Sequence, residues 1–385
     1  MKIAVLKERR PGETRVAATP ETVKKFVGLA CDVVVESDAG DPSNISNAAF
    51  EEAGAHIAQS PSDAVKGADV ILKVSRPMTG ADGENEVSGL PENSILMSSL
   101  QALTEKDAVE ALAQQKITAF AMELMPRITR AQSMDILSSQ SNLAGYKAVI
   151  DAAATFGRAM PMMMTAAGTI APARVLVFGA GVAGLQAIAT AKRLGAVVLA
   201  TDVRYAAKEQ VESLGGKFIV VDEEAMRAAE TEGGYAKEMS DEFKQKQAEA
   251  VRAEVVKADI VVTTALIPGR PAPKLVAADV VAAMKAGSII VDLAVESGGN
   301  VEGSQLGETV TTDNGVTIIG HANMPARLAR DSSALYARNL FNFLSPMIDK
   351  ETGDLNIDWE DDVVTGTLVA KEGQVVHPRL TGEGG

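Results

Sequence analysis

A glycine-rich turn between two apolar runs constrains this chain more than any other feature. The run Arg174–Phe178 leads into Gly179-Ala-Gly-Val-Ala-Gly184, and a helical stretch and a second apolar run, Ala196–Thr201, follow. Asp202 closes the second run, 23 positions after Gly179. The order strand, Gly-x-Gly-x-x-Gly turn, helix, strand and acid is typical of a dinucleotide-binding βαβ unit. The sequence therefore predicts a nucleotide-binding α/β domain, although a tight turn without a ligand can contain the same glycines.

Each glycine has a physical role in such a turn. Gly179 permits the sharp bend, Gly181 lets the backbone approach a pyrophosphate, and Gly184 lets the helix pack closely on the strand. The free N–H groups at the start of the helix then point at the phosphates. Asp202 is expected to accept hydrogen bonds from a ribose 2′-OH and to repel a 2′-phosphate, which favours NAD(H) over NADP(H). Arg204 either attracts that phosphate, stacks beside the adenine, or is a solvated rim residue.

The bulk composition excludes several classes of protein. A chain of 385 residues is long enough for two domains. The net charge of −14 argues against nucleic acid or an anionic membrane surface as the direct partner. Cys31 is the only cysteine, which excludes an intrachain disulfide framework and a cysteine-based metal site and fits a reducing compartment. No window holds about 18 uninterrupted apolar residues, so we expect no direct membrane insertion.

Apolar runs alternate with helical stretches along both halves of the chain. In the first half the expected strands are Lys2–Leu6, Asp32–Glu36, Asp69–Val74, Ser94–Met97 and Ile117–Ala121, and the expected helices are Pro20–Leu29, Ile45–Ala53, Ser62–Lys66 and Glu105–Gln114. In the second half strands are expected at Arg174–Phe178, Val197–Thr201, Lys217–Val221, Asp259–Thr264, Ser288–Asp292 and Thr317–Ile319. This pattern predicts an α/β protein with two doubly wound Rossmann-like domains and mostly parallel sheets.

Long helices are expected to join the two domains, with a cleft between them. Met134–Phe156 has apolar residues at helical intervals, and Ala329–Phe343 is a further helix. The strand-like pieces Val363–Val369 and Gln374–His377 are expected to return to the first domain. The predicted domains are therefore residues 1–137 with 329–385, and a nucleotide-binding domain over residues 138–328.

A polar segment between the predicted domains carries candidate chemistry. Arg127 and Arg130 offer fixed cationic donors, Gln132 can donate and accept, and Asp135 and Ser138 are one helical turn apart. Because ligand clefts form where domains meet, we expect this segment to line one. The alternative is that Ser-Met-Asp135 only caps the start of the long helix.

Other candidates lie after strands of the second domain. Leu266 follows a strand end and contacts either an adenosine or its packing neighbours. Asp292 and Glu296 are candidate acids, although surface acids are common in so acidic a chain. Gly234 and Tyr235 follow Gly233, and this pair of glycines can hinge a mobile lid over the nucleotide. The alternative is a surface loop that leads to a solvated helix.

Histidines are scarce, which bears on the reaction. His56, His321 and His377 are the only three, and none lies near the glycine turn or Arg127 in sequence. A dehydrogenase acting on an alcohol or amine also moves a proton and usually positions a His or Lys. Transfer between two nicotinamide rings moves only a hydride and requires orientation and exclusion of water. The sequence favours the second chemistry, with His321 either contributing or merely satisfied at a strand end.

The segment Met122–Tyr146 resembles the signature of the NAD(H)-binding component of proton-translocating NAD(P) transhydrogenases. The similarity continues through Met163–Gly168, the glycine turn, Ala265–Gly269 and Leu293–Asn300, and so covers nearly the whole chain. The family resemblance implies a Re/Si-specific enzyme in which this chain, the first portion of the alpha subunit, binds NAD(H). A beta-subunit component would bind NADP(H), and hydride would pass directly between the rings.

The resemblance also implies partners and site residues. The chain would be a homodimer at the cytoplasmic face of the inner membrane, docked through separate membrane-spanning subunits that translocate protons. The catalytic residues, which orient the nicotinamide and its ribose or phosphate, would be Arg127, Gln132, Asp135 and Ser138. The cofactor-binding set would be Arg127, Gln132, Leu137, Ser138, Gly179, Ala180, Gly181, Val182, Asp202, Val203, Arg204, Gly234, Tyr235, Gln247, Thr264 and Leu266.

Alanine dehydrogenase is more distantly similar. Arg15 and Lys73 stand where its substrate-binding Arg and Lys would be expected. Its catalytic His looks replaced by Gln101 or a neighbouring Ser, and its catalytic Asp by Glu296. Amine chemistry without its acid/base group would be badly impaired. An alanine-type dehydrogenase and a nucleotide-sensing regulatory protein therefore stay open as alternatives, and the transhydrogenase component is favoured.

Overall fold

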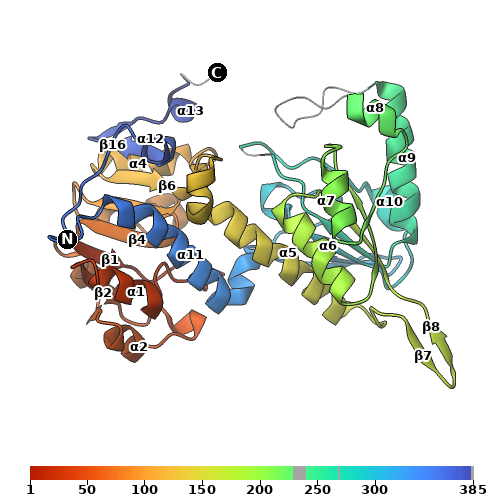
Figure 1. Cartoon of the computed structure of the whole chain (residues 1–385), viewed down its shortest axis with the longest axis horizontal. Coiled ribbons are helices and arrows are strands. Elements are labelled where there is room, and N and C mark those ends of the chain that lie inside the picture. Colours follow the sequence, from red (N-terminus) through yellow and green to blue (C-terminus); the bar gives the residue numbers. More distant parts are fainter. Residues whose placement is uncertain (229–239, 268, 383–385) are drawn as a thin grey trace. The chain divides into compact units, whose positions relative to one another are not determined.

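The computed structural model describes residues 1–228, 240–267 and 269–382. The chain divides into two units, one formed by Met1–Gln140 with Ala326–Gly385 and one by Ser141–Pro325. Figure 1 follows the chain through both, and the first unit contains the two ends of the colour scale. The boundaries expected from the sequence, after residues 137 and 328, differ from this division by three residues.

The first unit is built on a sheet with strand order β17-β16-β6-β5-β4-β1-β2-β3. The first six strands in the sequence run parallel, and the last two join one edge antiparallel. The strands are β1 (Lys2–Val5), β2 (Asp32–Glu36), β3 (His56–Ala58), β4 (Val70–Ser75), β5 (Ile95–Ser99), β6 (Thr118–Ala121), β16 (Leu368–Lys371) and β17 (Gln374–Val375). The C-terminal segment therefore returns to the first sheet, as expected.

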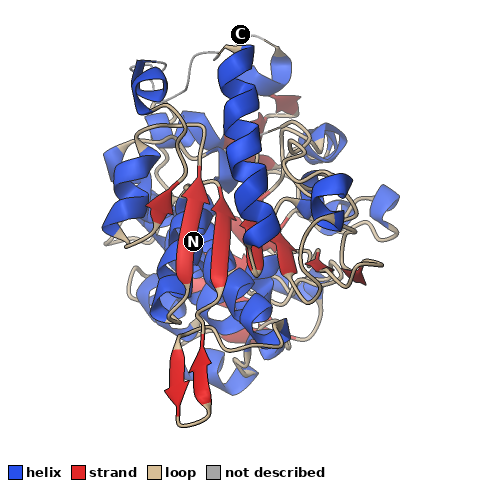
Figure 2. Ribbon diagram, turned by 90° about the vertical axis from the view of Figure 1, so that its right-hand side faces the viewer, coloured by secondary structure: helices blue, strands red, loops and turns tan. Residues whose placement is uncertain are grey.

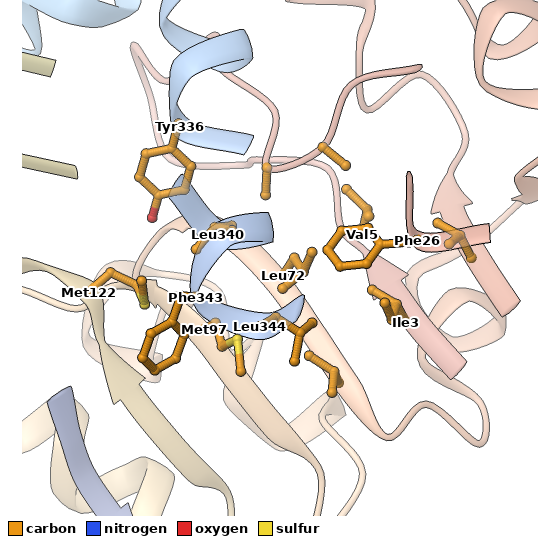
Figure 3. Packing of buried hydrophobic residues seen from close by; sticks show 14 of the residues in the cluster. Ile3, Val5, Phe26, Leu72, Met97, Met122, Tyr336, Leu340, Phe343 and Leu344 are labelled. Carbon is orange, nitrogen blue, oxygen red and sulfur yellow. The ribbon is translucent and has the colours of Figure 1, made fainter. Parts of the chain in front are cut away.

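Helices cover both faces of this sheet because side chains alternate along its strands. Ile3 and Val5 pack in one apolar cluster with α1 and α11, whereas Ala4 packs in another with α3 and α4. Figure 3 shows Tyr336, Leu340 and Phe343 of α11 pointing into the first cluster. The helices of this unit are α1 (Pro20–Val27), α2 (Asn47–Glu52), α3 (Pro61–Val65), α4 (Lys106–Gln114), α11 (Ala329–Leu344), α12 (Asp362–Thr367) and α13 (Pro378–Thr381).

The second unit is a seven-stranded sheet with order β11-β10-β9-β12-β13-β15-β14, in which only β14 is antiparallel. Its strands are β9 (Arg174–Phe178), β10 (Val197–Thr201), β11 (Lys217–Phe218), β12 (Ile260–Thr263), β13 (Ile289–Asp292), β14 (Thr309–Thr311) and β15 (Thr317–Ile319). The helices are α6 (Val182–Arg193), α7 (Ala207–Ser213), α8 (Glu223–Ala228), α9 (Asp241–Lys257) and α10 (Ala278–Ala282), while α5 (Ile136–Thr155) spans the division. Two doubly wound, mostly parallel sheets confirm the predicted fold class.

Both faces of the second sheet are also covered. Val175 and Val177 of β9 pack in a cluster with α5 and α6, and Leu176 and Phe178 pack in a cluster with α9 and α10. Alternate residues of one strand thus fill two separate cores, which explains why β9 is a continuous apolar run. The carboxyl ends of the parallel strands are left to loops, and the glycine turn is one of them.

A two-stranded hairpin stands apart from this sheet. β7 (Met163–Thr165) pairs antiparallel with β8 (Gly168–Ile170), and every residue from 161 to 171 is exposed. Figures 1 and 2 both show the hairpin extending away from the second unit. The sequence did not predict it, because its strands are only three residues long and have no buried face.

Three further elements differ from expectation. The run expected at Lys217–Val221 forms only the two-residue β11. Val363–Val369, expected as a strand, is mostly the helix α12, because the Asp361 carboxylate accepts the N–H of Val363 (2.7 Å) and caps it. The short edge strands β3 and β14 were not expected, since neither is long enough to show an alternating pattern.

Candidate nucleotide-binding site

The glycine turn joins β9 to α6, and two of its three glycines are required by the protein itself. Gly179 has a φ of +89°, and a Cβ there would lie 2.5 Å from Thr264 Oγ1. A Cβ on Gly184 would lie 1.8 Å from the carbonyl oxygen of Gly179. These glycines therefore allow the bend and the close contact between helix and strand, as predicted.

Gly181 differs from the other two. Its φ of −77° suits any residue, and a Cβ there would meet no protein atom within 4 Å. The first N–H of α6 bonded within the helix is that of Leu185, which donates to the carbonyl of Gly181 (2.8 Å). The N–H groups of Val182, Ala183 and Gly184 therefore lack carbonyl partners in the helix. Open space beside free N–H groups at a helix start fits an anionic ligand.

Exposed apolar side chains surround the same edge of the sheet. Val182, Val203 and Leu266 follow the adjacent strands β9, β10 and β12, and they are 41%, 78% and 55% exposed. Ile267, which the sequence analysis did not single out, is exposed beside Leu266. Large apolar side chains in water are costly unless something covers them, so their grouping around the turn favours a ligand with an apolar surface.

Asp202 lies after β10 with its carboxylate turned toward the glycine turn. It accepts hydrogen bonds from the backbone N–H of Ala180 (2.7 Å) and of Arg204 (2.8 Å). The Arg204 guanidinium adds bonds from Nε and Nη2, both 3.0 Å. Burial alone would raise the pKa of Asp202, but the bonds from Arg204 and the backbone of Ala180 lower it below its usual value. Asp202 is therefore a carboxylate at neutral pH.

Two further predicted binding residues sit beside the turn. Thr264 donates its hydroxyl to the carbonyl of Phe178 (2.9 Å), so it holds the start of the turn. Gln247 of α9 donates to the carbonyl of Ile219 (3.1 Å), while its Oε1 is buried without a hydrogen-bond partner in the described part of the chain. A buried acceptor without a donor is costly, so Gln247 Oε1 is suited to a ligand hydroxyl.

The predicted residues of the first unit fall into two groups. Arg127 and Gln132 are exposed, and no hydrogen bond or ion pair joins their side chains to another described residue. Arg130, by contrast, forms a two-bond ion pair with Asp361, at 2.9 and 2.7 Å. Two of the three polar side chains are thus available to a ligand, and the third is part of the protein's own packing.

Asp135 and Ser138 bond to each other at the start of α5. The Asp135 carboxylate accepts the N–H groups of Leu137 (2.8 Å) and Ser138 (3.1 Å) and the Ser138 hydroxyl (2.5 Å). This is the geometry of a helix N-cap, so the structural alternative weighed for this segment holds for Asp135. Leu137 is 50% exposed beside it.

The remaining candidates have structural partners. Asp292 is fully buried and accepts bonds from Thr263 Oγ1 and from the N–H groups of Ala294, Asn300 and Val301. It therefore shapes the loop after β13 and is not an accessible acid. Glu296 is exposed and accepts the N–H of Asn323 (3.2 Å).

His321, Gly234 and Tyr235 complete the predicted candidates. His321 lies 3.6 Å from the Asp151 carboxylate and 3.4 Å from the Thr309 hydroxyl. Gly234 and Tyr235, with the predicted lid, lie outside the described residues. In the described ranges no His, Cys, Asp and Glu side chains form a group that could hold a metal, and no helix there is both long and apolar enough to cross a bilayer.

The two doubly wound sheets and the glycine turn define a Rossmann-type nucleotide-binding fold. Models of the alanine dehydrogenase/PNT N-terminal and C-terminal domains match residues 4–144 and 148–378. The chain belongs to this family of nicotinamide-nucleotide oxidoreductases.

Individual relatives agree with this assignment. The first portion of the NAD(P) transhydrogenase alpha subunit of Rhodospirillum rubrum, a separate chain, is 63% identical over 384 residues, which is 100% of each chain. The crystal structure of transhydrogenase from Sinorhizobium meliloti is 50% identical, with a TM-score of 0.88 over 98% of this chain and 100% of that one. Alanine dehydrogenase of Halomonas elongata is 31% identical over 91% of this chain and 88% of its own. The resemblance to transhydrogenase alpha subunits is therefore confirmed, with alanine dehydrogenase more distant.

Proposed function

We propose that this chain is the NAD(H)-binding alpha component of a proton-translocating NAD(P) transhydrogenase. When bound, NADH supplies a hydride to NADP⁺ held on a beta-subunit component, and separate membrane-spanning subunits couple that transfer to proton movement. The observation that carries the proposal is the open turn at Gly181, where a Cβ would meet no protein atom and three N–H groups lack helical partners. The names of the transhydrogenase relatives support it.

Each residue at the turn has a role in this proposal. The N–H groups at the start of α6 bind the pyrophosphate, and Asp202 accepts the ribose hydroxyl. Val203 and Leu266 cover the adenosine, and Gln247 Oε1 accepts a hydroxyl donor. In the first unit Arg127 and Gln132 orient the nicotinamide and its ribose or phosphate, and Asp135 holds Ser138 for the same purpose. All of these roles concern binding and orientation, which is what hydride transfer between two rings requires.

The proposal includes the assembly. We propose a homodimer that works in the cytoplasm, at the cytoplasmic face of the inner membrane, and reaches the membrane through its partner subunits. The large negative charge of the chain supports docking on protein partners over direct contact with anionic lipid.

An alanine-type dehydrogenase is the competing function, and the first unit argues against it. Lys73 is fully buried, with its ammonium 3.0 Å from Glu86 and 3.4 Å from Glu8. Arg15 forms a two-bond ion pair with Glu13 and also donates to Gln140. Both cations therefore already have carboxylate or amide partners, and Gln101 at the expected histidine position cannot act as a general acid.

One pair of assays separates the two functions. The purified chain, mixed with an NADP(H)-binding beta component, should convert NADH and NADP⁺ to NAD⁺ and NADPH. The chain alone should not oxidise NADH in the presence of pyruvate and ammonia. Brisk turnover in the second assay would replace the proposal by an amino-acid dehydrogenase, and NADH binding without activity in either assay would indicate a regulatory protein.

A further inference from the structure

Asp202 has no free lone pair for a ribose. A carboxylate offers four acceptor positions, two on each oxygen. Oδ1 accepts the backbone N–H and the Nε of Arg204, and Oδ2 accepts the backbone N–H of Ala180 and the Nη2 of Arg204. All four positions are occupied, so a ribose hydroxyl can bond to Asp202 only if one of these donors leaves.

Only the guanidinium can leave without unfolding the turn. The N–H groups of Ala180 and Arg204 belong to the backbone of the loops after β9 and β10, and they fix the carboxylate from both sides. The Arg204 side chain is 40% exposed, whereas that of Asp202 is 6% exposed. An ion pair open to water on one side contributes little to stability, so its bonds to Asp202 are cheap to exchange.

We propose that Arg204 is a specificity-determining residue that competes with the ribose 2′-OH for Asp202 and at the same time screens its charge. This inference rests on the proposed function, because it assumes that Asp202 receives the adenosine ribose. The guanidinium lowers affinity for NADH, since it must be displaced. It also reduces the repulsion between Asp202 and a 2′-phosphate, so Arg204 makes the site less selective than the carboxylate alone would be.

The test is equilibrium titration of the full chain with NADH and with NADPH, followed by nucleotide fluorescence. Arg204→Ala leaves the two backbone donors in place and frees two acceptor positions. We expect its Kd for NADH to fall about two- to fivefold, the range that loss of an exposed ion pair allows. Its Kd for NADPH should rise, because the carboxylate is then uncompensated, and the ratio of the two constants should increase about tenfold.

Arg204→Lys separates the two effects. An ammonium keeps the charge but cannot form the two-pronged pair, so NADH should bind as tightly as in Arg204→Ala while NADPH binds as in the wild type. Arg252→Ala is the matched control, because Arg252 forms an exposed ion pair with Asp279 away from the turn, and its titrations should equal those of the wild type.

The outcomes also separate this inference from the proposed function. Equal weakening of both nucleotides in Arg204→Ala would overturn the competition, since it would mean that the guanidinium only supports the site. If the wild-type chain does not bind NADH, or if Asp202→Ala binds it unchanged, the proposed function fails. Normal NADH binding with an unchanged NADH-to-NADPH ratio in both Arg204 variants sinks the inference alone.

Discussion

At the scale of single residues, the two exposed polar side chains of the first unit test the proposed chemistry. Arg127 is exposed without a partner among the described residues, whereas Arg130, three positions away, is tied to Asp361. The two arginines therefore form a matched pair with the same chemistry and different surroundings.

We expect Arg127→Ala to slow hydride transfer at least tenfold while the Kd for NADH changes less than about threefold, because an orienting contact acts mainly on the reacting geometry. Arg130→Ala should transfer hydride at the wild-type rate and lose under about 1 kcal/mol of stability, the usual contribution of an exposed ion pair. The measurements are single-turnover transfer with the beta component, NADH titration and thermal unfolding. Equal losses of rate and affinity in Arg127→Ala would make it a mere anchor.

Two glycines of the turn provide a second residue-scale prediction. Gly181→Ala should fold normally, within about 1 kcal/mol of the wild type, because its new methyl group meets no protein atom. NADH affinity should nevertheless fall at least tenfold, since that methyl group fills the space reserved for the pyrophosphate. Gly184→Ala should lose about 3 kcal/mol of stability, because its methyl group collides with the Gly179 carbonyl. Unchanged NADH affinity in Gly181→Ala would remove the main support for the site.

At the scale of elements, most of the fold could be predicted because parallel strands are buried on both faces. Runs such as Arg174–Phe178 and Ile289–Asp292 are apolar at nearly every position, so they stand out in the sequence. The hairpin at 163–170 could not be found in this way, since all of its residues are exposed.

The site shows the same division. The glycine turn and Asp202 were predictable because their spacing follows from the backbone path of a βαβ unit. The pairing of Arg204 with Asp202 was not, because it depends on how the loop after β10 turns two residues on. The capping role of Asp135 was weighed, and only the bonds to Leu137 and Ser138 decide it.

The contact between α1 and α11 gives an element-scale prediction for pH. Hydrogen bonds from Arg338 and Lys25 lower the pKa of Glu21 to about 2, against an ordinary value of 4.5. Because the folded-state pKa is depressed, the pair stabilises the fold above about pH 4.5, and this contribution is lost as the pH falls to about 2. Since the carboxylate is exposed, we expect Glu21→Gln to cost under about 1 kcal/mol at pH 7 and nothing at pH 2.

Urea unfolding at several pH values measures this difference. Glu242→Gln is the control, because Glu242 pairs with Lys246 inside α9 and joins no second element. A loss for Glu21→Gln that stays constant from pH 7 to pH 2 would show that the carboxylate acts through packing and not through its charge.

At the scale of the whole molecule, the hairpin formed by β7 and β8 supports the proposed homodimer. Met162, Met163, Met164 and Ile170 are 60%, 45%, 77% and 42% exposed, and residues 159–173 include no charged side chain. A lone two-stranded hairpin is marginal in water. Two copies that each carry a charge of −14 repel one another, so an uncharged apolar arm is the surface best suited to join them.

We therefore expect the double variant Met163→Asp/Met164→Asp to be monomeric in analytical ultracentrifugation at concentrations where the wild type is a dimer. Leu306→Asp is the matched control, because Leu306 is a single exposed apolar residue, 59% accessible, elsewhere in the second unit. It should leave the dimer intact. A dimer that survives the double variant would place the interface on another surface.

The account as a whole depends on hydride passing directly from a nucleotide on this chain to one on a partner. NADH with deuterium at the transferred position of C4, mixed with this chain, the beta component and NADP⁺, tests it most directly. We predict that the deuterium is recovered in NADPH, with none released to water. Label found in the solvent or in a reduced small metabolite, with none in NADPH, would contradict the account.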